Sequence, residues 1–197
     1  MKRSIFLFVF SALLFNSAVV FADKTTFFGV AIQNGSATHS LDGIDDIDMD
    51  SSGFSLYLGS EINDFSRIKG GMHFSNYESK DSEGLDIDNF GFEIDYLLFF
   101  KVNRLKPYLS VGMDSASWSY DEEYFGELSE SSILGVGLRL GTGVLFHVSD
   151  SIEIDAGVLY KKIKWQDIEY IRFFGDNVTL KQDTSVLNFQ LGLNYKF

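Results

Sequence analysis

The chain has 197 residues, 45% of them hydrophobic and 22% charged, with a single proline and no cysteine. This length indicates one domain, and the composition excludes a collagen-like chain, a disulfide scaffold and a disordered tail. A formal net charge of −12 repels phosphate backbones, so we expect no nucleic-acid partner. Twenty Phe, nine Tyr and 18 Gly favour an all-β fold.

The first 22 residues have the pattern of a secretory signal peptide. A basic Met-Lys-Arg start precedes an apolar stretch at residues 5–15, and Val-Phe-Ala at residues 20–22 suits a signal peptidase. An uncleaved anchor helix is the alternative, but Asn16 interrupts the apolar stretch. We therefore expect cleavage after Ala22, which leaves residues 23–197 as one exported domain.

Beyond residue 22, apolar and polar residues alternate over segments of about ten residues, which is typical of strands with two unlike faces. No apolar run approaches the roughly 20 residues that a membrane-spanning helix needs. Eight segments predict eight strands, at residues 25–34, 53–62, 65–77, 89–101, 109–114 after Pro107, 132–146, 151–163 and 185–197. The segment at 89–101 is the clearest.

The connections between these segments alternate in length. Short turns are expected at residues 63–64, 102–106 and 147–150, and long polar loops at residues 35–52, 78–88, 121–131 and 162–184. The short and long connections therefore fall on opposite rims, as in an up-and-down barrel. Most of the acidic residues belong to the long loops, so one rim is acidic.

The cost of burying polar groups in lipid decides which face points outward. Bulky Phe, Leu and Ile dominate one face of each segment, whereas the other carries Gly, Ser, Asn and charges. A soluble lipocalin-like barrel would place the apolar face inside, but so many small polar residues suit a packed interior better. We predict an eight-stranded antiparallel transmembrane β-barrel with a polar core, in which glycines of the 132–146 strand make room.

Charged residues on the polar faces form two predicted layers in the lumen. The layer nearer the short turns contains Glu61, Arg67, Lys69, Glu153 and Asp155. The layer nearer mid-height contains His73, Glu93, Asp95, Asp114 and Arg139. These charges could line a narrow ion path, but we favour a static network in which they neutralise one another.

A run of acids in the first long loop is dense enough in oxygen ligands to suggest a divalent cation. The ligands would come from Asp45, Asp46, Asp48 and Asp50. The run lacks the glycine and the terminal glutamate of an EF-hand loop, so a solvated acidic loop is the favoured interpretation. We expect no other metal and no cofactor.

Aromatic residues cluster near both rims. Those near the long loops could anchor at lipid headgroups or contact a host protein, and are Trp118, Tyr120, Tyr124, Phe125, Trp165, Tyr170, Phe173 and Phe174. A girdle at the opposite rim would consist of Phe100, Phe146, Tyr195 and Phe197. The last long loop also carries Lys162, Lys164 and Arg172, which makes it the candidate for adhesion.

These features together resemble the small outer-membrane β-barrel family, which includes OmpA-type transmembrane domains, Ail/OmpX-like adhesins and opacity-type proteins. The ending Leu-Asn-Tyr-Lys-Phe, with Tyr195 and Phe197, resembles the signal by which that family is handed to the barrel-assembly machinery. The resemblance implies a monomer in the bacterial outer membrane, in contact with lipid and lipopolysaccharide. Fold alone does not select a function, because the family includes adhesins, small pores, structural proteins and lipid-modifying enzymes.

The segment His73-Phe74-Ser75-Asn76 resembles the His-x-Ser-Asn motif of outer-membrane lipid A deacylases, in which a His activates a Ser nucleophile. Here the motif falls on the third strand, and parity points His73 and Ser75 into the lumen. We therefore expect a non-enzymatic barrel with a structural or surface-interaction role. A narrow porin and a deacylase-like enzyme are the alternatives.

Overall fold

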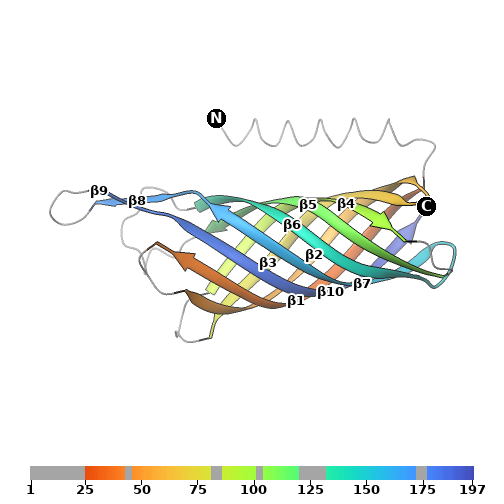
Figure 1. Ribbon diagram of the computed structural model, residues 1–197, viewed down its shortest axis with the longest axis horizontal. Coiled ribbons are helices and arrows are strands. Elements are labelled where there is room, and N and C mark those ends of the chain that lie inside the picture. Colours follow the sequence, from red (N-terminus) through yellow and green to blue (C-terminus); the bar gives the residue numbers. More distant parts are fainter. Residues whose placement is uncertain (1–24, 43–45, 81–85, 101–103, 120–131, 172–176) are drawn as a thin grey trace.

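The computed structural model describes residues 25–42, 46–80, 86–100, 104–119, 132–171 and 177–197 (Figure 1). The predicted signal peptide and its cleavage site lie outside these residues. Within them, no helix is long and apolar enough to cross a membrane.

Eight antiparallel strands form one closed barrel, as predicted (Figure 1). The strands are β1 (Thr26–Leu41), β2 (Ile47–Asn63), β3 (Ser66–Ser79), β4 (Asp86–Phe99), β5 (Leu105–Ser119), β6 (Ser132–His147), β7 (Ile152–Trp165) and β10 (Gln182–Lys196). Consecutive strands pair, and β1 closes the ring on β10 from Phe27↔Lys196 to Leu41↔Gln182. Closure satisfies the backbone groups of every strand, which a lipid-exposed sheet requires.

The two faces of the strands have the predicted orientation. Along β6, Leu138 is 65% exposed on the outer wall, whereas its neighbour Arg139 is 1% exposed inside the barrel. The same alternation of exposed apolar and buried residues runs along β10 and the inner half of β1. The apolar face therefore lies outside, which confirms the choice against a lipocalin-like arrangement.

The strands are longer than predicted at the end where the long connections lie, which we call the outer end. Residues 35–52 were expected to form a loop, but most of them continue β1 and β2 with pairs such as Ser36↔Asp50 and Thr38↔Asp48. That expectation is wrong because alternation reveals a strand only where its outward residues are apolar. Backbone pairing continues where they are polar.

A second, two-stranded sheet occupies the last long connection. It consists of β8 (Ile168–Ile171) and β9 (Asn177–Leu180), paired antiparallel. Figure 1 shows this hairpin beyond the outer end of the barrel. The sequence pattern indicated only a polar loop there.

The barrel interior is layered rather than uniformly polar, which corrects the prediction of a polar core. An outer apolar layer contains Ala37, Met49, Tyr77, Ile87, Ala116, Trp118, Ile133, Ile163, Trp165 and Val186. Two smaller apolar clusters lie nearer the short turns: one contains Phe27, Ala31 and Tyr57, and the other contains Leu97, Phe99, Tyr108 and Leu145. Charged side chains fill the space between the outer layer and these clusters, and Arg67 lies between the two clusters, against the rings of Phe27 and Phe99.

Glycines on β6 make room in the lumen, as predicted, but Gly135 and Gly137 do so for large side chains of the outer apolar layer rather than for polar ones. A Cβ atom added at Gly135 would come within 2.5 Å of the Trp165 ring, and one at Gly137 within 3.0 Å of Ile163. The missing side chains thus let two bulky residues of β7 fill the lumen beside β6.

Candidate functional site

One arginine organises the charges at the middle of the lumen. The Arg139 side chain is fully buried, with Nε 2.9 Å from Oδ1 of Asp95 and Nη1 2.7 Å from Oε2 of Glu93. A third carboxylate, Asp114, lies 3.4 Å from the same Nη1. Strands β4 and β5 therefore direct three acids at one guanidinium on β6, a fork-shaped group suited to several carboxylates.

Two lysines supply the remaining positive charge of this layer. Lys69 Nζ lies 3.7 Å from Asp95, and Lys161 Nζ lies 3.6 Å from Asp114. Together with Arg139 they balance the three acids. Lys161 is absent from the predicted network, although it shares the inward parity of Glu153 and Asp155 on the same strand, so alternation could have identified it.

A second cluster lies at the inner end of the lumen, as predicted for Arg67, Glu61 and Glu153. Arg67 donates a hydrogen bond to Glu61, and its Nη2 donates another to Glu153 Oε1 over 2.9 Å. Two bases that were not predicted join Glu153. His147 Nδ1 lies 2.9 Å from Oε1, and Lys196 Nζ lies 3.3 Å from the same oxygen. Both lie at strand ends, where alternation is a weak guide.

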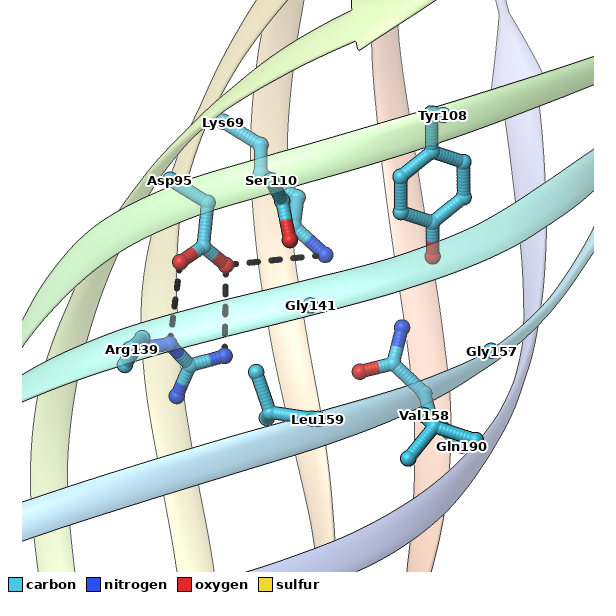
Figure 2. Close-up of a pocket in the computed structure, with 10 residues that line it drawn as sticks. All are labelled: Lys69, Asp95, Tyr108, Ser110, Arg139, Gly141, Gly157, Val158, Leu159 and Gln190. Atoms are coloured by element: carbon cyan, nitrogen blue, oxygen red, sulfur yellow. Dashed lines mark hydrogen bonds and ion pairs between the residues drawn. The ribbon is translucent and has the colours of Figure 1, made fainter.

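Asp155, the remaining acid of the predicted network, is held by hydrogen bonds from two neutral side chains. It accepts one from the Tyr108 hydroxyl at 2.8 Å and one from the Gln190 amide at 3.2 Å. A cavity of about 10 Å³ lies between Tyr108 and Gln190 on one side and the Lys69–Asp95–Arg139 group on the other (Figure 2). That volume holds about one water molecule, so this part of the lumen is nearly filled.

The outer apolar layer closes the lumen above the charges. The Thr184 hydroxyl oxygen accepts a hydrogen bond from Trp165 Nε1 at 2.7 Å and lies 2.8 Å from His39 Nδ1. The Trp118 ring packs edge-on against both His39 and Trp165, with centroids 5.4 and 5.8 Å away. The expectation that Trp118 and Trp165 lie at the lipid interface is wrong, because both side chains point inward and are buried.

The other aromatic residues predicted near the long loops cannot be placed in the same way. Their side chains lie outside the part of the chain that the structure describes, and they are Tyr120, Tyr124, Phe125, Tyr170, Phe173 and Phe174. At the opposite rim, Phe100, Phe146, Tyr195 and Phe197 are exposed on the outer wall near the short turns. Their role as an assembly signal or an interfacial girdle stays a prediction.

The deacylase-like pair lies in the lumen, as its parity predicted. His73 and Ser75 are both buried, and no hydrogen bond joins them. The His73 ring instead faces two carboxylates, with Nδ1 3.8 Å from Glu93 and Nε2 3.7 Å from Asp114. A serine nucleophile needs a base in hydrogen-bond contact, which this geometry does not supply.

Two of the four acids of the predicted cation site, Asp48 and Asp50, lie on β2. Asp48 Oδ1 accepts a hydrogen bond from the Thr38 hydroxyl at 3.2 Å, and Asp50 Oδ1 lies 3.1 Å from Lys80 Nζ. Asp46 is exposed and Asp45 lies outside the described residues. Among the residues described, no three His, Asp or Glu side chains gather closely enough to hold a metal ion.

Comparison with known proteins agrees with this architecture. Residues 8–197 match the family model of the outer membrane protein beta-barrel domain. A search of curated proteins finds no match.

Solved structures with the same fold include three outer-membrane proteins of low sequence identity. Neisserial surface protein A is 21% identical, covers 87% of this chain and 97% of its own, and superposes with a TM-score of 0.55. OprH from Pseudomonas aeruginosa is 17% identical, with coverages of 87% and 99% and a TM-score of 0.54. A major outer membrane protein from Thermus thermophilus is 14% identical, with coverages of 87% and 99% and a TM-score of 0.50. At these identities the likeness concerns the fold alone.

Proposed function

Because the chain belongs to the outer membrane protein β-barrel family, we propose that it is a non-conducting, non-enzymatic outer-membrane barrel. Its role is to present its outer rim for surface interaction or to support the envelope. The paired charges of the lumen serve to stabilise this scaffold.

The observation that carries the proposal is the packing of the lumen. An ion crossing the barrel would have to displace the Trp118–Trp165–His39 contacts of the outer apolar layer and then separate Arg139 from its carboxylates. Apolar constrictions exclude hydrated ions, and breaking a buried ion pair is costly. A static interior is therefore favoured over a narrow porin.

Planar-bilayer recording tests this proposal. The refolded wild-type barrel should give no discrete conductance steps. A general porin recorded in parallel is the positive control and should give steps, which shows that the assay detects insertion. Heat-dependent gel mobility of the same sample verifies that the barrel is closed. Reproducible steps from closed wild-type barrels would favour the porin instead.

Burial of His73 and Ser75 supports the non-enzymatic part of the proposal, because acyl chains of the membrane do not reach the lumen. Expression of the barrel in a Gram-negative host should leave the mass spectrum of lipid A unchanged. Loss of one acyl chain with the wild type, but not with Ser75→Ala, would establish the deacylase alternative.

A further inference from the structure

A ladder of three phenylalanine rings crosses the outer wall of β2, β3 and β4. Phe54 pairs with Phe74, and Phe74 pairs with Phe90. The ring centroids lie 4.9 and 5.0 Å apart, and the side chains are 45%, 39% and 37% exposed. These contacts join the three rings into one continuous aromatic surface.

A polar row lies directly beside this ladder, two residues further along each strand toward the outer end. Its members Ser52, Asn76 and Asp88 also pair across the strands. Asn76 Nδ2 donates a hydrogen bond to Asp88 Oδ1 over 3.0 Å. That bond leaves the Asn76 carbonyl and the second Asp88 oxygen as acceptors.

A groove of about 640 Å³ runs between the ladder and the polar row. Both rows line it, and Ser117 of β5 lies at its end beside Phe90. The short serine side chains next to large rings leave this space open. Its volume is in the range of small-molecule sites, and it combines an apolar surface with a few polar groups, as such sites do.

The groove lies where the apolar outer wall gives way to polar residues. Next outward on the same strands come Asp50, Glu78 and Asp86, whereas the residues toward the inner end are apolar, such as Leu56 and Met72. In an outer-membrane barrel this boundary corresponds to the headgroup level of the outer leaflet. An occupant must therefore present both an apolar and a hydrogen-bonding side.

The charges select among lipid headgroups. Asp88 and its acidic neighbour Glu78 repel a phosphate, so the groove favours an uncharged group. Aromatic ring faces are electron-rich and attract the polarised C–H bonds of a sugar ring. The amide and carboxylate oxygens can accept hydrogen bonds from sugar hydroxyls.

We propose that this groove binds a pyranose ring of an outer-leaflet glycolipid, stacked on the Phe54–Phe74–Phe90 ladder and hydrogen-bonded to Asn76 and Asp88. The site goes beyond the proposed function, because it lies on the outer wall and depends neither on the lumen nor on rim contacts.

Native mass spectrometry of the detergent-purified full barrel tests the site, with dephosphorylated lipid A, whose sugars are uncharged, as the lipid A probe and phosphatidylglycerol as the phospholipid comparison. Phe74→Leu removes a ring but keeps an apolar side chain, and Asp88→Ala removes the acceptor. Each should weaken lipid A binding roughly three- to tenfold, and neither should weaken phosphatidylglycerol binding. Phe189→Leu, at an exposed ring on β10 beyond β1, is the matched control and should change neither.

Every other result overturns the proposal. Equal losses for both lipids would make the groove an acyl-chain contact, and equal losses in Phe189→Leu would make the binding non-specific. Unchanged lipid A binding in both groove variants would exclude a sugar site. Heat-dependent gel mobility verifies closure of each variant. If Phe74→Leu does not fold, Asp88→Ala decides the outcome, because it changes an exposed polar position.

Discussion

Arg139 is the residue on which the charged layer depends most. Its guanidinium contacts Glu93, Asp95 and Asp114, and all four side chains are buried. Buried pairs contribute little compared with a well-packed apolar replacement, but the loss of one partner leaves the others uncompensated. Loss of a single base from this layer should therefore strongly destabilise the barrel, although the intact layer has no net charge.

Arg139→Ala should lower the free energy of unfolding by about 3–5 kcal/mol, because three buried carboxylates lose their shared partner. Urea titration of the refolded barrel in lipid vesicles measures the change. Lys162→Ala, which removes the exposed partner of Asp183 on the outer wall, should change it by less than about 1 kcal/mol. Equal effects of the two substitutions would contradict a buried network.

Gly143 is a second sensitive position, for a steric reason. A Cβ atom there would lie 2.6 Å from the Ala156 carbonyl oxygen and 2.6 Å from the Tyr108 hydroxyl. Because the carbonyl belongs to the backbone and cannot move aside, Gly143→Ala should destabilise the barrel by about 1–3 kcal/mol in the same urea titration. Gly70→Ala is the control, since a Cβ atom there meets only the Glu93 carbonyl at 3.6 Å.

At the scale of elements, the strands of the barrel and the β8–β9 hairpin are separable. The last pairs of the barrel in this region are Lys164↔Asp183 and Gly135↔Trp165, and β8 and β9 pair only with each other within the described chain. The ring of eight strands closes without the hairpin. This separation lets the outer end vary while the barrel stays closed.

Deletion of residues 168–180 should therefore change the free energy of unfolding by no more than about 1 kcal/mol, because no barrel pair is lost. The variant should still insert and keep its heat-dependent gel mobility. If the hairpin carries the surface interaction, binding of cells that display the variant to host cells should fall. A barrel that no longer closes would show that the hairpin is part of the fold.

At the scale of the whole molecule, closure leaves no free strand edge in the eight-stranded barrel. The β1–β10 ladder joins the first and last strands along their full length, from Phe27↔Lys196 to Leu41↔Gln182. An open sheet would leave backbone donors and acceptors unpaired in hydrocarbon, at a cost of several kcal/mol each. The closed form is thus strongly favoured in lipid.

The closed barrel should resist SDS until it is heated. Outer-membrane fractions should show a band that migrates faster without boiling than after boiling, because the folded barrel stays compact. Identical mobility under both conditions, or recovery in the soluble periplasmic fraction, would contradict a closed membrane barrel.

The sequence alone determined the number of strands in the barrel, their antiparallel order and which face lies outside. These follow from local alternation, such as Phe90, Phe92 and Ile94 against Gly91, Glu93 and Asp95, which burial in lipid imposes on each strand separately. Parity also placed Arg139, His73 and Ser75 in the lumen.

Only the tertiary structure decided which inward residues meet. Arg139 finds Asp95 and Lys161 finds Asp114 because the register around the whole ring brings them to one level, and no local pattern encodes that register. The same register gathers Trp118 and Trp165 into an apolar layer inside a barrel whose interior was expected to be polar. Polar strand ends such as Ser36↔Asp50 likewise form because backbone pairing continues beyond the apolar wall, where alternation carries no signal.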